Sequence, residues 1–200
     1  MNRTFGIIGA GNISQTIARH LVKAGYSVTI SNSRNAESLG DVIASLGNGV
    51  KAATAVQAAA CDIVILALPW KSLPSLPSLT QWKGKYVIDA TNHFVTFYPD
   101  FKLDDLGSKT SSEVVESYVT GAKLVKAFNT LGFKLLEKDP QEAGGRRVLF
   151  LSGDDADFKS EIMDVIKAIG FAPIDLGSLA AGGKLQQAKG NLAAINLVQL

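Results

Sequence analysis

The sequence carries one short glycine-rich segment whose spacing could bind a pyrophosphate. Residues 9–14 read GAGNIS, follow an apolar run and precede a stretch with helical periodicity. In a turn of this kind Gly9 permits a sharp bend, and Gly11 lets a phosphate approach the backbone. The free amides and the dipole at the start of the following helix then favour the anion. Ser14 stands where Gly or Ala is usual, but it is still small. We expect a dinucleotide site here, with an ordinary glycine-rich turn as the alternative.

A second group of polar residues follows the next expected strand, about 20 residues further on. It consists of Ser31, Asn32, Ser33 and Arg34. A site for NAD usually places an acidic residue here to hold the ribose 2′-hydroxyl, and this segment has none. Hydroxyls, an amide and a guanidinium can instead donate to a 2′-phosphate. The segment predicts NADP rather than NAD, against the alternative of a polar loop.

Three later strand ends are notable, and two of them carry amide and hydroxyl side chains. The segments are 68–70, 90–93 and 127–130, which read LPW, ATNH and AFNT. In an open α/β sheet, ligands lie beyond the carboxyl ends of the strands, where the strand order reverses. We therefore expect these segments near the nicotinamide end of the cofactor, although Asn and Thr also favour ordinary turns.

Other side chains with distinctive chemistry are few, because the sequence has only two histidines and one cysteine. His93 is interpreted either as a polar surface residue or as a donor to a negatively charged acceptor. His20 is expected to face solvent, and Cys61, just before an apolar strand, is expected to be a small core residue. Since these residues are far apart in the chain, we expect no metal site, and no Ser-His-Asp arrangement stands out.

Short β-rich runs alternate with helical stretches along most of the chain. Strands are expected at Thr4–Ile8, Ser27–Ser31, Val50–Ala53, Ile63–Leu68, Tyr86–Ala90, Lys123–Ala127, Arg147–Ser152 and Ala172–Asp175. Several are almost continuously apolar, as in a parallel strand that is covered on both faces. Thr110 and Asp154 are expected to be helix N-caps. The alternation predicts an α/β fold, a Rossmann-type doubly wound and mainly parallel sheet of about eight strands.

Composition sets further limits. Of the 200 residues, 46% are hydrophobic and 19% are charged, and the formal net charge is +2. These values predict a globular chain without a nucleic-acid-binding surface or a polybasic membrane anchor. The longest apolar run, Ile63–Trp70, is too short to span a bilayer, and the first residues lack the pattern of a signal peptide. With a single cysteine, a cytoplasmic location is expected.

The chain is expected to consist of two unequal parts. Residues 1–176 would form an NADP-binding Rossmann domain, and residues 177–200 a short helical segment that completes the cleft or a dimer interface. A chain of 200 residues leaves no room for a separate substrate domain of equal size. Because residues 191–200 carry no charged side chain, we expect them to pack on the sheet or against a second copy in a homodimer.

The motifs occur together in an order that resembles a known family. They read GIIGAGNISQTIA, SNSR, DIVILALPW, VIDATN, VKAFNT, VLFLSGDD, FAPIDLGSL and GGKLQQ, and they span nearly the whole chain. The chain is similar to the short NADPH-dependent reductases of the coenzyme F420:NADP oxidoreductase-like family. Its nucleotide domain also resembles that of pyrroline-5-carboxylate reductase and the NADPH domain of ferric reductases.

The resemblance implies where both ligands would bind. The residues implied to hold the pyrophosphate and the 2′-phosphate are Gly9, Gly11, Asn12, Ile13, Ser31, Asn32, Ser33 and Arg34. Those implied to surround the nicotinamide are Leu68, Pro69, Thr91, Asn92, Ala127 and Asn129. The second ligand would be approached by His93 and by residues 182–187, including Gly183 and Gln186.

The resemblance also implies an activity, which is hydride transfer between NADP(H) and a planar redox acceptor. Coenzyme F420 or a flavin would be this second substrate. Such an acceptor takes a hydride without a strong general acid, which fits a sequence without an evident acid–base pair. No side chain is identified as catalytic. The alternatives are a ferric or metal-chelate reductase and a non-catalytic NADPH-sensing protein.

Overall fold

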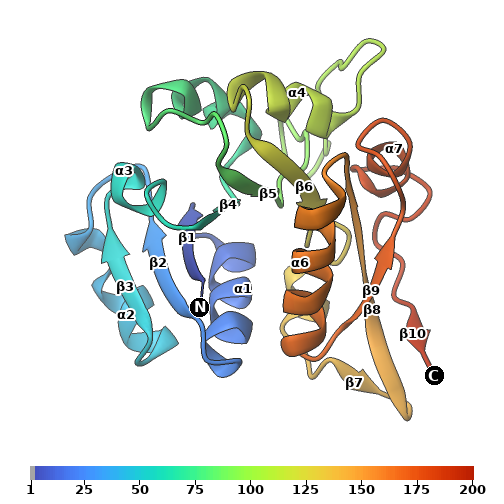
Figure 1. The fold of residues 1–200 in the computed structure, drawn as a ribbon, viewed down its shortest axis with the longest axis horizontal. Helices are drawn as coiled ribbons and strands as arrows, with labels where there is room; N and C mark the ends of the chain where they lie inside the picture. Colours follow the sequence, from blue (N-terminus) through green and yellow to red (C-terminus); the bar gives the residue numbers. More distant parts are fainter. Residues whose placement is uncertain (1–2) are drawn as a thin grey trace.

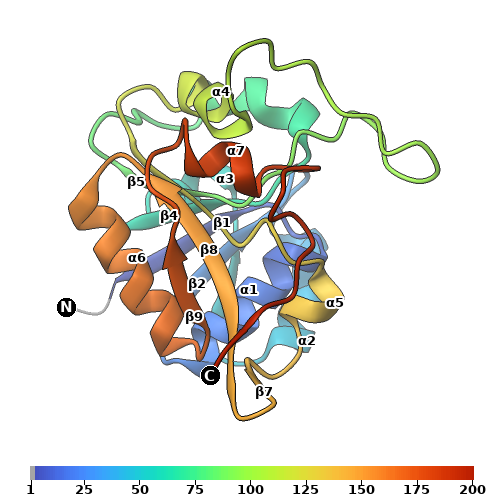
Figure 2. The same ribbon diagram turned by 90° about the vertical axis from the view of Figure 1, so that its right-hand side faces the viewer.

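The protein is built around one mainly parallel β-sheet with helices packed on both faces (Figures 1 and 2). The computed structural model describes residues 3–200. The strands are β1 (Thr4–Ile8), β2 (Ser27–Ser31), β3 (Val50–Ala53), β4 (Ile63–Leu66), β5 (Tyr86–Asp89), β6 (Lys123–Ala127), β7 (Gln141–Glu142), β8 (Gly145–Gly153), β9 (Ala172–Asp175) and β10 (Val198–Gln199). The α-helices are α1 (Asn12–Lys23), α2 (Gly40–Leu46), α3 (Ala55–Ala58), α4 (Ser111–Tyr118), α5 (Phe133–Leu136), α6 (Ala156–Ala168) and α7 (Gly182–Gln186), and the 3-10 helices are η1 (Glu37–Leu39) and η2 (Trp70–Ser78).

The strand order confirms the predicted fold class. From one edge the order is β3-β2-β1-β4-β5-β6-β8-β10, and all neighbours from β3 to β6 are parallel. Strand β8 runs antiparallel to β6 and pairs with β9 in parallel. The order β3-β2-β1-β4-β5-β6 is that of a dinucleotide-binding sheet, in which the order reverses between β1 and β4. The carboxyl ends of β1 and β4 therefore meet at the place where ligands bind in such sheets.

Apolar residues on the two faces of the sheet form two separate cores. Helices α1, α2 and α6 pack on one face through side chains such as Ile17, Leu46 and Ile162, all of which are buried. Elements α3, η2 and α4 cover the other face, where Leu73 and Val115 are buried. Because the central strands are covered on both faces, their sequences are continuously apolar, as in the IVIL of β4.

Two helix N-caps were predicted, and the structure confirms one of them. Thr110 caps α4, with its hydroxyl accepting from the Glu113 amide while the Glu113 carboxylate accepts from the Thr110 amide. The prediction that Asp154 caps α6 is wrong. Asp155 is the N-cap and accepts from the Phe158 amide at 2.8 Å, whereas Asp154 accepts from the Leu179 amide at 3.3 Å.

The C-terminal segment departs from the expected helical form. Only α7 is helical there, and the chain then runs back along the sheet to pair β10 with the start of β8 (Figure 2). Together with β7, this pairing raises the number of strands in residues 3–200 to ten rather than eight. Leu192 packs on Val148 and Phe150 on the way. Two-residue strands of this kind carry no periodicity that a sequence could show.

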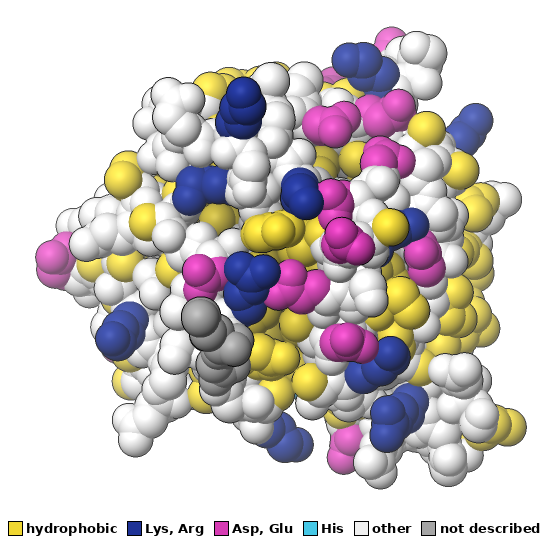
Figure 3. Space-filling view, viewed as in Figure 1, with side chains coloured by type: hydrophobic (Ala, Val, Ile, Leu, Met, Phe, Trp, Pro, Cys, Tyr) yellow, Lys and Arg dark blue, Asp and Glu magenta, His cyan; other side chains and the backbone are white. Residues whose placement is uncertain are grey.

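The surface matches the balanced composition. Figure 3 shows basic and acidic side chains interspersed over the face of the molecule that is seen in Figure 1. Across residues 3–200, no helix combines the length and apolarity that a membrane crossing requires.

Candidate functional site

The glycine-rich turn leads directly from β1 into α1 and contacts the neighbouring strands on both sides. The Gly9 amide donates to the Ser31 carbonyl at 2.9 Å, which joins the turn to the end of β2. Gly9 has a φ of 125°, and a Cβ atom there would lie 2.1 Å from the Ala67 carbonyl oxygen beyond β4. Only glycine fits this position, both because of the backbone angle and because of the close approach.

The start of α1 is open in the way that an anion site requires. Gly11 is the N-cap, so no side chain caps the helix, and the first turn contains no acidic residue. A Cβ atom on Gly11 would meet nothing within 4 Å. The amides that open a helix have no acceptor inside it, and the helix dipole is positive at this end. The predicted residues Gly11, Asn12 and Ile13 therefore lie where backbone donors are left without an acceptor inside the helix, which is the kind of position that favours an anion.

Ser14, which departs from the usual Gly or Ala, has a structural role. Its side chain is buried, and its hydroxyl donates to the Ala67 carbonyl at 3.2 Å. This bond ties the first turn of α1 to the end of β4. The substitution therefore preserves the close contact between helix and sheet that a smaller residue would give.

In the segment predicted to bind the 2′-phosphate, two side chains are hydrogen-bonded within the protein and two are exposed. The buried Ser31 hydroxyl donates to the Ile7 carbonyl at 3.0 Å within the sheet. Asn32 accepts from the Arg34 amide at 2.9 Å, and its own amide donates to Ser38 at 2.8 Å, so it fixes the loop. Ser33 and Arg34 are exposed, and the Arg34 side chain has no ion-pair or hydrogen-bond partner among residues 3–200. The guanidinium is thus available to an anion beside the glycine-rich turn.

The later strand ends are joined by a ladder of side-chain amides. Asn92 donates to the Asn129 carbonyl at 3.0 Å, and Asn129 donates to the Asn92 side-chain oxygen at 3.1 Å. Asn129 also donates to the Gln186 carbonyl at 2.6 Å, and the Gln186 side chain donates back to the Asn129 oxygen at 3.0 Å. The ladder ends on Ser152, which donates to Gln186 at 2.9 Å. The structure thus brings the ends of β5 and β6 together with α7.

A buried ion pair beneath the ladder was missed by the sequence analysis. Lys126 Nζ lies 3.0 Å from Asp89 Oδ2, and both side chains are fully buried. Asp89 also accepts from the Ser112 hydroxyl and from the amide and hydroxyl of Thr91, while Lys126 donates to the Thr91 carbonyl. The predicted Thr91 hydroxyl is therefore engaged with Asp89. The available signal was an acidic residue at the end of one apolar strand and a lysine near the end of the next, which the register places side by side.

The remaining predicted residues lie around the same edge of the sheet. Leu68 is half-buried and Pro69 is exposed, immediately after β4, while Ala127 is buried at the end of β6. Gly183 is buried at the start of α7, where a Cβ atom would lie 3.4 Å from the Thr110 hydroxyl. An added methyl group there would make only an ordinary contact with Thr110.

Of the two histidines, His93 is buried and His20 is half-buried. His93 is only 4% exposed, so its interpretation as a polar surface residue is wrong. Burial, reinforced by Lys126 and Lys189 and opposed by Asp104, lowers the pKa of His93. His20 was expected to face solvent, but its Nε2 lies 2.7 Å from the Leu136 carbonyl, and burial lowers its pKa too.

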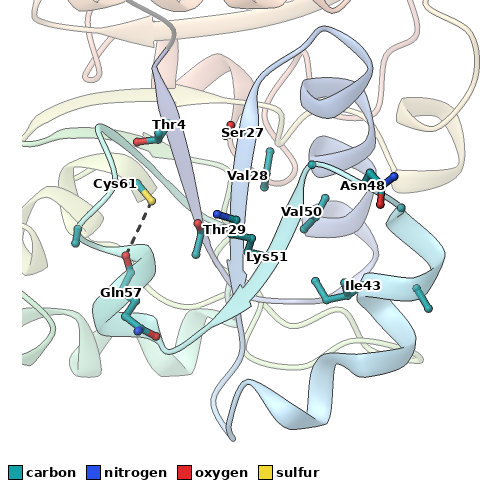
Figure 4. Close-up of a pocket in the computed structure, with 14 residues that line it drawn as sticks. Thr4, Ser27, Val28, Thr29, Ile43, Asn48, Val50, Lys51, Gln57 and Cys61 are labelled. Carbon is teal, nitrogen blue, oxygen red and sulfur yellow. Dashed lines mark hydrogen bonds between the residues drawn. The ribbon is translucent and has the colours of Figure 1, made fainter.

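A separate hollow lies near the amino ends of β1, β2 and β3 (Figure 4). It has a volume of about 770 Å³. Figure 4 shows Thr29 and Lys51 on one side of the strands and Val50 on the other, so the hollow wraps around the sheet edge. Cys61 lines it and is half-buried rather than a core residue. Because parallel sheets bind ligands at the carboxyl ends of their strands, we place the candidate site at the opposite edge.

Comparison with known proteins shows which proteins this arrangement resembles. The family model described as "NADP oxidoreductase coenzyme F420-dependent" matches residues 4–93, which extend from β1 to the segment just after β5. A solved structure from Sinorhizobium meliloti, the hypothetical protein SMa0349, is 42% identical, with a TM-score of 0.92 over 100% of this chain and 96% of that one. Residues 4–93 of the chain are thus similar to the coenzyme F420-dependent NADP oxidoreductases, and the whole chain shares its fold with the protein from Sinorhizobium meliloti.

Two further proteins are similar in sequence, and a third shares the fold alone. A candidate F420-dependent NADP-reductase from Arthrobacter sp. FB24 is 25% identical, with a TM-score of 0.76 over 89% of this chain and 86% of that one. The metalloreductase STEAP3 of Rattus norvegicus is 29% identical over 90% of this chain, which corresponds to only 35% of its own length. Pyrroline-5-carboxylate reductase from Coxiella burnetii shares the fold at 17% identity, with a TM-score of 0.60 over 89% of this chain and 60% of its own.

Proposed function

We propose that the protein transfers hydride between NADP(H) and a planar redox acceptor, a deazaflavin such as coenzyme F420 or a flavin. The observation that carries the proposal is the open, uncapped start of α1 beside a loop that contains Arg34 and has no acidic residue from 31 to 34. When bound, NADPH would supply the hydride. The residues at the carboxyl edge would hold it and keep water from the reacting atoms.

The residues that would hold each part of NADP(H) follow the order of the strands. The turn after β1 would bind the pyrophosphate, and Ser33 with Arg34 after β2 would bind the 2′-phosphate. Leu68 and Pro69 after β4 would flank the nicotinamide end, next to the amide ladder after β5 and β6. Because ladder amides are already paired with one another, they would act as a rigid wall.

A second candidate is supported by the relatives that are named metalloreductases. The match to rat STEAP3 extends over 90% of this chain, so it includes the strands beyond the family model. In this alternative the acceptor is a metal chelate, or a flavin that passes electrons to one. The chain spans about a third of the length of those relatives, 35% for rat STEAP3. We rank the direct planar acceptor first because the family model names coenzyme F420.

We also propose that the protein forms a homodimer. The tail packs on the sheet through Leu192 and β10, yet Ile195 and Leu197 remain 38% and 41% exposed and Leu200 is 94% exposed. Leu185 of α7 adds a further exposed apolar side chain. A second copy that covers these residues would remove them from water.

A screen of hydride acceptors tests the proposed function. NADPH consumption by the full chain is followed at its absorbance maximum with coenzyme F420, FMN or iron(III) nitrilotriacetate. We expect turnover with F420 or FMN, and weaker or no turnover with the iron chelate alone. Rapid iron reduction without any flavin or deazaflavin would favour the second candidate. Tight NADPH binding without turnover of any acceptor would contradict both candidates and favour a sensor.

A further inference from the structure

His93 is a buried histidine whose ring makes no hydrogen bond. Its Nδ1 is inaccessible to solvent and has no partner, and no hydrogen bond from either ring nitrogen is present among residues 3–200. Buried polar side chains almost always have a partner, because an unpaired buried group costs about 1–3 kcal/mol. His93 therefore has hydrogen-bonding capacity that the folded chain leaves unused.

The surroundings of His93 place this unused capacity at the candidate site. His93 directly follows Thr91 and Asn92 at the end of β5, and its ring lies edge-on to Trp70 after β4, with 6.0 Å between the ring centroids. The backbone is held in place, because the Asp104 amide donates to the His93 carbonyl at 2.9 Å. Asp104 in turn accepts from Trp70 Nε1 at 2.7 Å. The ring is thus fixed where the segments after β4 and β5 meet.

The neighbouring polar side chains are already hydrogen-bonded within the protein. Asn92, Asn129 and Gln186 are bonded to one another in the ladder, and the Thr91 hydroxyl is bonded to Asp89. A ligand with a polar edge would have to break one of these bonds to pair with the amides or the hydroxyl. It could pair with His93 without breaking any bond.

The charge state of His93 indicates which ligand group would suit it. The charged groups that act on the ring are Lys126 and Lys189, which oppose its protonation, and Asp104, which favours it. Asp89 is neutralised by Lys126. Burial and the two lysines keep the pKa of His93 below its ordinary value of about 6.5, so the imidazole is uncharged at neutral pH. An uncharged imidazole pairs well with a carbonyl or ring N–H and is a poor partner for an anion.

We propose that the ring of His93 hydrogen-bonds to the polar edge of the planar hydride acceptor. The inference rests on the proposed function and names the residue that recognises the second substrate. It assigns no proton transfer to His93. It also predicts selection for an acceptor with a heteroaromatic amide edge, as in a flavin or deazaflavin ring, over an anionic chelate.

Ring-nitrogen NMR of the full chain tests the proposal, because the sequence has only two histidines. The ¹⁵N-labelled protein is first saturated with NADP⁺ and then titrated with FMN or, separately, with coenzyme F420. We expect the acceptor to shift the ring nitrogens of His93 and leave those of His20, which is paired with Leu136, unchanged. An acceptor that covers the His93 ring would exclude the water that still reaches it, so the pKa of His93 should fall further in the ternary complex.

Two variants of His93 distinguish the loss of a hydrogen bond from the loss of packing. His93→Phe keeps an aromatic ring beside Trp70 but cannot pair, and it should raise the KM for the acceptor by about 5- to 30-fold. His93→Gln, which can pair, should remain within about 3-fold of the wild type. His20→Gln is the matched control and should leave this KM unchanged. The Kd for NADPH should be the same in all four proteins.

The outcomes distinguish this inference from the proposed function. If NADP⁺ fails to bind, the proposed function and this inference both fail. If NADP⁺ binds but neither acceptor moves the His93 ring nitrogens, the inference alone is overturned. Equal KM values for His93→Phe and the wild type would overturn it as well.

Discussion

Arg34 is the residue on which the choice between the two nicotinamide cofactors depends. Its guanidinium is exposed and unpaired within residues 3–200, and Asn32 holds the loop that presents it. Arg34→Ala removes a charge-assisted contact of about 1.5–3 kcal/mol, so the Kd for NADPH should rise by roughly 10- to 100-fold. The Kd for NADH, which lacks the 2′-phosphate, should hardly change. Fluorescence titration with both cofactors measures this difference.

Arg34→Lys provides the control for this prediction. It keeps the charge but loses the planar guanidinium, so we expect an intermediate Kd for NADPH. Equal losses for NADPH and NADH in Arg34→Ala would show that Arg34 does not contact the 2′-phosphate.

The buried pair of Lys126 and Asp89 should be critical for stability. Lys126→Met leaves the Asp89 carboxylate buried without its counter-charge, and we expect a loss of about 3–5 kcal/mol in the free energy of unfolding. Lys167→Met removes a surface pair with Asp164, whose side chain is 74% exposed, and serves as the control. Its loss should be at most about 1 kcal/mol. Denaturant unfolding of both variants tests the prediction, which would be contradicted by similar losses.

At the scale of elements, the start of α1 is the feature on which cofactor binding depends. A Cβ atom on Gly11 meets no protein atom within 4 Å, so Gly11→Ala should fold normally. The added methyl group would occupy the space that a pyrophosphate needs, and we expect NADPH binding to weaken by more than about 10-fold. Thermal unfolding and calorimetric titration of the variant separate the two effects.

Gly40→Ala is the matched control, because Gly40 also starts a helix and its added Cβ atom also meets nothing within 4 Å. Because Gly40 has a helical backbone conformation, alanine there should raise the melting temperature slightly and leave the Kd for NADPH unchanged. If Gly11→Ala binds NADPH as tightly as Gly40→Ala does, the pyrophosphate does not lie at α1.

Most elements could be predicted because their signals are local. Strands β1, β2, β3, β6 and β9 have the predicted bounds, since apolar runs bounded by polar residues mark buried parallel strands. The capping box at Thr110 was also local. The tail could not be predicted, because β10 depends on pairing with β8, some 50 residues away in sequence. Asp154 and Asp155 are adjacent acids, and sequence alone does not decide which one caps α6.

The positions of the candidate-site segments could be predicted from the sequence, but the hydrogen bonds of their side chains could not. The glycine-rich turn and the strand ends lie together as expected, because parallel strands bring their carboxyl ends to one edge. The bonds that engage Ser31, Asn32 and Thr91 depend on partners elsewhere in the fold. The burial of His93 was unpredictable for the same reason, since Trp70 and Asp104 that surround it are far from it in the chain.

At the scale of the whole molecule, the exposed apolar tail predicts self-association. Sedimentation velocity at micromolar concentration should show a dimer, and Leu197→Glu should convert it to a monomer because a buried charge is costly. Val56→Glu changes an exposed apolar residue of α3, which is 55% exposed, and should leave the dimer intact. A monomeric wild type would reject the proposal.

The location of the nucleotide site is the central claim, and one NMR titration tests it most directly. NADP⁺ is added to the ¹⁵N-labelled full chain, and the shifted backbone amides are mapped onto the structure. We predict that the largest shifts fall on residues 11–14 and 32–34, at the carboxyl edge of the sheet. Shifts confined to residues 48–51 and 57–61, around the hollow in Figure 4, would contradict the account, as would a spectrum that NADP⁺ leaves unchanged.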